Sequence, residues 1–148
     1  MKKTLGAIVA GFVIQMTGLV LIHSVWLKQD YIITAAVWRA PEAQTARIWA
    51  MLLGTLIYAA AAVLIYIRGV EPKPWAGQGV RFGILVALVT VVYSSLSGWV
   101  ILPVPHMLVV KWIAGESVLC VVFGLVVAAI CQPVAGNSEN RNLKIENR

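Results

Sequence analysis

The sequence predicts an all-α fold, a polytopic membrane protein in which four transmembrane helices form an antiparallel bundle. The first observation behind this prediction is composition: 60% of the 148 residues are hydrophobic and only 12% are charged, which lies outside the usage of soluble domains. The second is the spacing of the charges, which leaves four long apolar stretches. They are bounded by Lys3 and Lys28, by Arg47 and Arg68, by Arg81 and Lys111, and by Lys111 and the tail, the last interrupted only by Glu116. Because a bilayer core of about 30 Å needs roughly 20 apolar residues in a helix, each stretch is long enough to span.

We therefore expect a single four-helix transmembrane domain over residues 1–135, with helices at about 4–27, 47–68, 80–102 and 108–131. A membrane β-barrel is rejected because runs such as AAAAVLIYI are continuously apolar and do not alternate. The first apolar run is too long for a secretory signal and lacks a small-residue cleavage site, so it is expected to remain as a helix. Residues 136–148 are polar and of mixed charge, which predicts a disordered cytoplasmic tail.

The distribution of lysine and arginine predicts the orientation, because cytoplasmic loops carry an excess of them. With the N-terminus inside, the inner side holds Lys2, Lys3, Arg68, Lys73, Arg81, Arg141, Lys144 and Arg148. The outer side then holds Lys28, Arg39, Arg47 and Lys111. We therefore predict an inner (plasma) membrane protein with both termini cytoplasmic. The net charge of +6 follows from this bias and from contact with anionic lipids, so no nucleic-acid partner is expected.

The tryptophans are expected to lie at the membrane interfaces, because all six fall near a predicted helix end. Trp26, Trp99 and Trp112 are predicted interface anchors at outer helix ends. Lys111 is also near an outer helix end, where its long side chain can reach the headgroups, so we interpret it as a further interface anchor.

Small residues at spacings of three or four mark the helix faces that pack in lipid. Every predicted helix carries such a stripe. The packing glycines that we expect on these stripes are Gly11, Gly18, Gly54, Gly83 and Gly124. On the fourth helix, Glu116, Cys120 and Gly124 are each four residues apart, so Glu116 is predicted to face the packed interior.

Glu116 is the unusual residue, because it lies roughly 6 to 8 Å deeper than Lys111 at 1.5 Å per residue. An acid at that depth costs about 2 to 3 kcal/mol unless it is paired, solvated or protonated. The predicted partners at a similar depth are His23, Ser94 and Ser97, with Tyr93 slightly deeper. Our hypothesis is a polar chamber that opens outward, with Glu116 bonded to His23 or to hydroxyls of the third helix.

The alternative is that these polar groups only satisfy one another and fix the helix register. His23 weakens the chamber hypothesis, because on a regular α-helix it points about 80° away from Gln15 and off the small-residue stripe.

Several function classes are disfavoured. Cys120 and Cys131 lie on one helix roughly 16 Å apart, so the reactive pair of a membrane thiol oxidoreductase is missing. Small four-helix multidrug exporters carry their glutamate in the first helix, which here has none. A haem site is disfavoured because only one of the two histidines, His23, lies within a span.

A serine hydrolase built from Ser94 or Ser97 with His23 and Glu116 is formally possible, but no nucleophile motif supports it. We expect no enzyme activity, no cofactor and no metal site.

The segments GVRFGILVALV and LPVPHMLVVKWIAGESV resemble parts of small uncharacterised bacterial inner-membrane proteins with four helices. The resemblance rests on Arg81, Gly83, Pro103, Pro105 and Trp112 and covers helices three and four. It implies a bacterial inner-membrane protein and transfers no functional residue.

The first expectation is a non-enzymatic structural or accessory subunit in contact with membrane lipids, present as a homo-oligomer or in a larger membrane complex. The alternative is a small outward-opening binding or proton-coupled transport protein that uses Glu116.

Overall fold

The computed structural model describes residues 1–132, and within this range the chain is built from helices without strands. Four helices in it are long and apolar enough to cross a membrane: Lys2–Trp26, Ile48–Arg68, Trp75–Ile101 and His106–Cys131. The prediction of an all-α chain with four such helices is confirmed. The predicted tail, residues 136–148, lies outside the described residues.

Two of the four spans contain a change of helix type. The first span is α1 (Lys2–Leu19) followed by the π-helical segment η1 (Val20–Trp26), and the third is α5 (Trp75–Ala87), π-helical η3 (Leu88–Val92) and α6 (Tyr93–Ile101). The second and fourth are the regular helices α4 (Ile48–Arg68) and α7 (His106–Cys131). Between α1–η1 and α4 lie three short helices, α2 (Lys28–Ile33), the 3-10 turn η2 (Ala35–Val37) and α3 (Pro41–Thr45).

The third span was predicted to begin near residue 80, but it begins at Trp75. The reason is that hydrogen bonds between the first turns of this helix and the preceding loop hold the chain in place. Pro74 precedes the first turn, where its missing N–H is not needed. Gln78 is buried, accepts a hydrogen bond from the Glu71 N–H at 2.9 Å and donates to the carbonyls of Glu71 and Lys73 at 2.9 and 2.8 Å. These bonds hold the turn between α4 and α5 against the first turn of α5.

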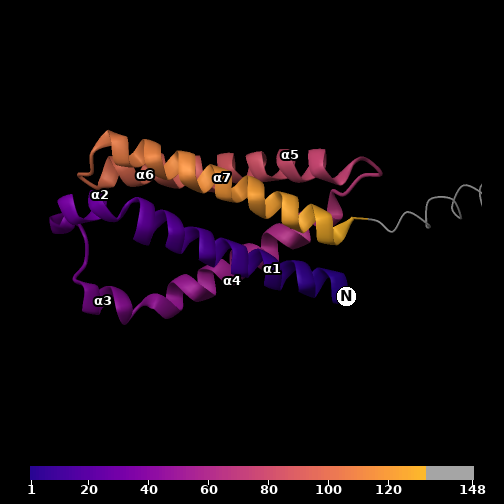
Figure 1. Cartoon of the computed structure of the whole chain (residues 1–148), viewed down its shortest axis with the longest axis horizontal. Coiled ribbons are helices and arrows are strands. Elements are labelled where there is room, and N and C mark those ends of the chain that lie inside the picture. Colours follow the sequence, from indigo (N-terminus) through magenta and orange to yellow (C-terminus); the bar gives the residue numbers. More distant parts are fainter. Residues whose placement is uncertain (133–148) are drawn as a thin grey trace, which may run out of the picture.

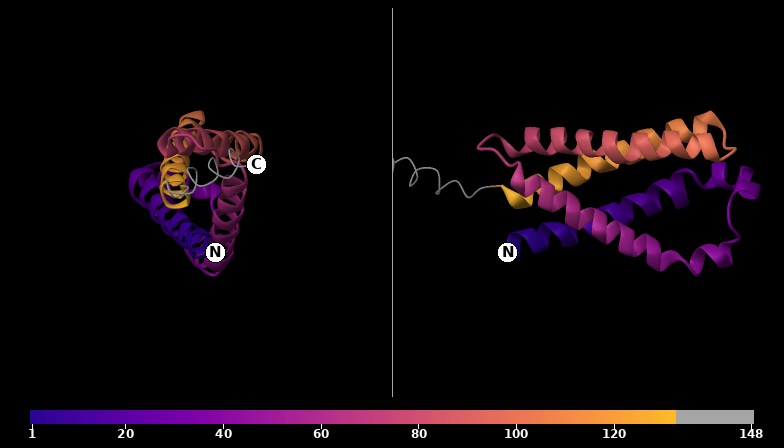
Figure 2. Two further views of the ribbon diagram at one scale, coloured as in Figure 1. Left: turned by 90° about the vertical axis from the view of Figure 1, so that its right-hand side faces the viewer. Right: turned by 180° about the vertical axis from the view of Figure 1, so that it is seen from behind.

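The spans run in alternating directions (Figure 1). The helices α2 and α3 and the turn between α6 and α7 lie at one end of the molecule, which we call the α2–α3 end. The N-terminus lies at the opposite end, which we call the N-terminal end (Figures 1 and 2). Consecutive spans are therefore antiparallel.

Helix α7 is the centre of the bundle, because it packs against α1, α4, α5 and α6. Its contact with α5 is backbone to backbone. A Cβ on Gly83 would lie 2.5 Å from the carbonyl oxygen of Cys120, and one on Gly79 would lie 2.8 Å from that of Gly124. The two glycines of the G-x-x-x-G sequence on α5 therefore pack inside the chain, against Gly124.

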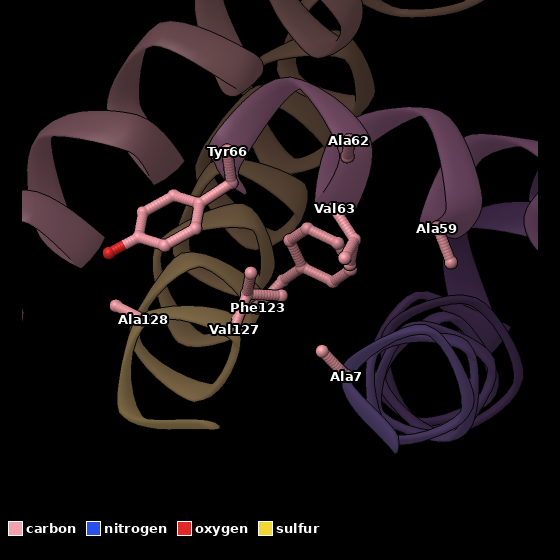
Figure 3. Close-up of a cluster of buried hydrophobic side chains, with 8 residues drawn as sticks. All are labelled: Ala7, Ala59, Ala62, Val63, Tyr66, Phe123, Val127 and Ala128. Carbon is pink, nitrogen blue, oxygen red and sulfur yellow. The ribbon is translucent and has the colours of Figure 1, made fainter. Parts of the chain in front are cut away.

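Two glycines of α1 receive large side chains of α7. A Cβ on Gly11 would lie 2.6 Å from a ring carbon of Phe123, and Gly18 faces Leu119 in the same way. Phe123 is fully buried and belongs to the main core cluster near the N-terminal end (Figure 3). This cluster joins α1, α4 and α7 through Ala7, Ala59, Ala62, Val63, Tyr66, Phe123, Val127 and Ala128.

Helix α4 crosses the others and diverges from them toward the α2–α3 end (Figure 2). It meets α5 near the N-terminal end, where the rings of Tyr66 and Phe82 pack edge to face with centroids 5.1 Å apart. Farther along, residues 48–54 are all exposed. A Cβ on Gly54 would meet no heavy atom of the described residues within 4 Å. Gly54 was predicted to pack against a neighbouring helix, and the divergence of α4 is the reason that the structure places it in the open.

Candidate functional site

A cavity of about 210 Å³ lies where α4 leaves the bundle. It is bounded by α1, α4, α7 and the η3–α6 part of the third span. Its lining is Gln15, Leu19, Gly54, Thr55, Tyr58, Thr90, Val91, Ser94, Glu116 and Cys120. Seven of these ten residues have polar side chains, although the cavity lies between helices that are otherwise apolar.

Glu116 lies 3.3 Å from His23, measured from its carboxylate Oε1 to the imidazole Nε2. The two side chains are 23% and 30% exposed, so the pair is only partly accessible. The π-helical geometry of η1 brings His23 to this place. A π-helix closes its hydrogen bonds over five residues instead of four, so each residue turns the side-chain direction by less than the α-helical 100°. Over Val20–His23 the smaller turn per residue brings the His23 side chain toward the helix face that carries Gln15. On a regular α-helix the two side chains would point in different directions.

A chain of hydrogen bonds continues from His23 to the α2–α3 end. The Trp112 Nε1–H donates to the Tyr31 hydroxyl oxygen at 2.7 Å, and that hydroxyl lies 2.6 Å from His23 Nδ1. Because an indole N–H can only donate, the Tyr31 proton is left for Nδ1, and a neutral His23 then carries its own proton on Nε2, toward Glu116. Trp112, Tyr31 and His23 thus form a directed chain of hydrogen bonds that ends next to Glu116.

Tyr31 stands outside the spans and is held in its neutral form. Burial raises the pKa of Tyr31 from 10.0 to about 12; the Trp112 hydrogen bond lowers it, and the negative charges of Glu116 and Asp30 raise it further. The neutral hydroxyl is the form that donates to His23, so this environment stabilises the directed chain.

The threonine and serine hydroxyl groups that line the cavity donate their protons within their own spans. The hydroxyls of Thr55 and Thr90 donate to the carbonyls of Met51 and Val86, each at 2.8 Å. Ser94 donates to the Val91 carbonyl at 3.2 Å. Each hydroxyl oxygen therefore keeps a lone pair that can accept a hydrogen bond from a molecule in the cavity.

Gln15 provides a further acceptor. Its side chain is 8% exposed and its Oε1 is buried without a hydrogen-bond partner among the described residues. A buried carbonyl oxygen that is left unpaired is destabilising by about 1 to 3 kcal/mol, so this atom marks a place where a donor is missing.

The structure brings together only part of the predicted chamber. His23 and Glu116 form a pair and Ser94 lines the cavity, whereas Ser97 is not part of the lining. Tyr93 was predicted to join these residues, but it is 72% exposed, because the first residue of α6 points away from the bundle.

Sequence reasoning missed several residues of the site. Thr55, Tyr58, Thr90, Cys120 and Gln15 line the cavity, and Tyr31 reaches it from α2 through His23. The signal for the first group was in the sequence, because each lies on or beside a small-residue stripe. Tyr31 had no such signal, since its position depends on how α2 folds back.

The predicted interface anchors separate into two groups. Trp26 and Trp99 are about half exposed, as an interfacial residue needs to be. Trp112 is only 9% exposed and lies in a second core cluster with Leu27 and Leu108. Its indole also packs edge to face on Trp38 with ring centroids 6.2 Å apart. The loop between the first two spans covers it, which is why it is not on the surface.

Lys111 does not extend freely to the headgroup region. Its Nζ lies 2.9 and 2.8 Å from the two carboxylate oxygens of Asp30 on α2. This ion pair ties α2 to the first turns of α7, and it compensates the charge of Lys111 next to the site.

The four long apolar helices are compatible with a multi-pass membrane protein. No family model, no curated protein and no solved structure matches this sequence. Its function is therefore argued from the site alone.

Proposed function

We propose that this chain is a non-enzymatic integral membrane protein that binds a small solute in the cavity at Glu116. The observation that carries this proposal is the shared cavity itself: Glu116 and Gln15, whose carbonyl oxygen is buried without a partner among the described residues, line a common space of about 210 Å³. If the polar groups only fixed the helix register, they would pair with one another and the space between them would close. A solute that donates hydrogen bonds would satisfy both groups.

The absence of enzyme activity is part of the proposal, and the bonding of Ser94 supports it. A nucleophilic serine needs a base that accepts its proton. The Ser94 hydroxyl donates instead to the carbonyl of Val91, three residues back on its own span, and His23 is engaged by Tyr31 and Glu116.

We place the chain in the inner (plasma) membrane of a bacterium, with both termini cytoplasmic and the cavity in the outer half of the bilayer. Support comes from the sequence bias of lysine and arginine and from the separation of the two sets of charges. Lys2 and Arg68 end up at the N-terminal end, and Lys28 and Lys111 at the α2–α3 end.

Proton coupling is supported by the chain from Tyr31 through His23 to Glu116. Intramembrane acids that carry protons or pair with cations commonly have such hydrogen-bonded neighbours. The chain gives Glu116 a proton-exchanging partner on the side away from the cavity, because His23 is not part of the lining.

An accessory subunit or homo-oligomer is the second candidate, and the divergence of α4 favours it. Residues 48–54 are exposed on all sides of the helix, and Ala50 and Gly54 form a small-residue face with no partner helix among the described residues. Such faces allow close helix approach in lipid.

The binding proposal is tested by thermal unfolding of the detergent-solubilised chain with three solutes of nearly equal size: benzyl alcohol, benzoate and benzylammonium. A solute that binds the folded state raises the Tm with concentration. Gly54→Leu is the blocking variant, because a side chain there meets open space beside the cavity. We expect at least one solute to raise the Tm of the wild type and not of Gly54→Leu.

Gly6→Leu is the matched control, since Gly6 is equally open but lies on α1 away from the cavity. It should keep the full shift. The same small shift for all three proteins would show that the solutes act on the micelle and would refute the binding proposal.

The second candidate is tested separately by native mass spectrometry of protein gently extracted from its own membrane. A fixed homo-oligomer or a second polypeptide would favour the accessory role. A bare monomer would count against it.

A further inference from the structure

We infer that the ligand of this cavity is a small organic ammonium ion, a protonated amine with one ring or a short alkyl chain. The inference rests on the proposed binding function and deepens it by naming the solute class. What points to it is the mismatch between acceptors and donors in the lining.

The lining offers acceptors from all sides of the cavity. Glu116 contributes its carboxylate from α7, and the side chain of Gln15, whose Oε1 is buried without a hydrogen-bond partner among the described residues, lines the cavity from α1. Thr55 on α4 and Thr90 on η3 line the same space, and their hydroxyl protons are already committed to backbone carbonyls. A ligand that satisfies these atoms has to bring several protons of its own. An ammonium group carries up to three donors and no acceptor.

The donors in the lining that are not committed to backbone carbonyls are neutral. They are the side-chain amide of Gln15 and the pair formed by Tyr58 and Cys120, whose hydroxyl and thiol lie 3.6 Å apart, so that one of their two protons is engaged between them. None of these groups supplies the charged donor that an anionic ligand would favour.

The charge of the lining is also one-sided. Glu116 is the only formally charged side chain among the ten lining residues. The nearby Lys111 is bound by Asp30 at 2.8 Å and is not in the lining. An anion in the cavity would face the Glu116 carboxylate, whose neighbour His23 lies outside the lining, whereas a cation would form the charge-assisted hydrogen bond that a partly buried acid favours.

The size of the cavity limits the cation. A cavity of about 150 Å³ is enough for benzene, so about 210 Å³ accommodates one ring together with an ammonium group. Leu19 and Val91 supply apolar lining for the hydrocarbon part.

The test compares the affinities of benzylammonium, benzyl alcohol and benzoate for the full chain by isothermal titration calorimetry. The three share a ring and differ in charge. One charge-assisted hydrogen bond corresponds to about tenfold or more in affinity, so benzylammonium should bind at least about tenfold more tightly than benzyl alcohol, and benzoate should not bind. Glu116→Gln and Gly54→Leu should lose benzylammonium binding, and Gly6→Leu should keep it.

Gln15→Leu provides a second variant that keeps the charge and removes the unpartnered acceptor. Because Leu is apolar and similar in volume, we expect this protein to fold and to bind benzylammonium about tenfold more weakly. It keeps the inference testable if Glu116→Gln does not fold.

Two outcomes would overturn the inference in different ways. If benzyl alcohol or benzoate binds as tightly as benzylammonium and Gly54→Leu abolishes it, the cavity is a solute site but the ammonium class is wrong. If none of the three binds in a manner that depends on Gly54, the proposed binding function fails as well.

Discussion

At the level of single residues, the position of His23 depends on backbone geometry. A regular α-helix points this side chain away from Gln15, whereas the π-helical η1 brings its Nε2 to 3.3 Å from Glu116. Tyr31 then fixes the orientation of the imidazole by donating to Nδ1 at 2.6 Å. The pairing of His23 with Glu116 is therefore held from both sides.

Tyr31 gives the first prediction, which concerns pH. Its folded-state pKa of about 12 lies above the ordinary value of 10.0. For a group whose pKa is raised by folding, the stabilisation is fully present below the unfolded pKa and is lost as the pH rises through the folded one. We therefore expect the chain from Trp112 to Glu116 to persist at pH 10 and to break as the pH approaches about 12.

The measurement is the ultraviolet absorbance titration of tyrosinate, taken as the difference between the wild type and Tyr31→Phe. The difference should titrate near pH 12. A midpoint near 10 would contradict the buried, hydrogen-bonded position of this hydroxyl.

At the level of elements, glycine decides how closely the helices approach. On α5, Gly79 and Gly83 allow the backbone of α7 to come into contact. On α4, Gly54 has no such neighbour. Glycine therefore forms a close interhelical contact on α5 but faces open space on α4. The reason is that α4 diverges from the bundle toward the α2–α3 end (Figure 2).

The second prediction follows from the α5–α7 contact. Gly83→Leu places a side chain where even a Cβ would lie 2.5 Å from the backbone of α7, so the two helices have to separate. We expect a loss of about 1 to 3 kcal/mol in the free energy of unfolding, measured by SDS titration of the protein in mild detergent.

Gly98→Leu is the matched control, since Gly98 lies on the same span and a Cβ there meets no heavy atom of the described residues within 4 Å. This variant should unfold within about 0.5 kcal/mol of the wild type. Equal losses in both variants would contradict the close α5–α7 contact as the cause, because leucine is a better helix former than glycine and helix propensity alone predicts no loss.

The two π-helical segments are a second feature at this level. Segment η1 carries His23, and η3 carries Thr90 and Val91 of the cavity wall. Both lie at the place where α4 diverges. Short π-helical turns are frequent at functional sites, and here η3 contributes to the cavity wall while η1 places His23 beside Glu116.

At the level of the whole molecule, the bundle has a packed half and an open half. The cluster around Phe123 closes the N-terminal end (Figure 3). The cluster around Trp112 closes the α2–α3 end beneath the loop helices. The cavity lies between these two clusters, so a solute in it would be enclosed on both ends and would leave sideways, past α4.

The third prediction concerns orientation in the membrane. In a background with Cys120 and Cys131 replaced by alanine, single cysteines are introduced at Ala40 and Ala76, which are both exposed and lie before α3 and at the start of α5. We expect a membrane-impermeant maleimide added to intact cells to label Ala40→Cys at once and Ala76→Cys only after permeabilisation. The opposite pattern would place the termini outside.

The sequence by itself determined the all-α fold and the four helices that are long and apolar enough to cross a membrane. An apolar run of about 20 residues is stable in lipid only as a helix, since a spanning segment has to satisfy its own backbone hydrogen bonds. It also indicated that Glu116 faces inward, because Glu116 shares a stripe with Cys120 and Gly124, which both pack against α5.

The tertiary structure decided which polar residues meet. Three features could not be read from regular helical spacing: the π-helical turn that re-aims His23, the folding back of α2 that brings Tyr31 and Asp30 over the site, and the divergence of α4 that opens the cavity. Each depends on contacts between segments far apart in the chain. The direction of a side chain within a span follows from local geometry, but the space in front of it is set by where the next helix crosses.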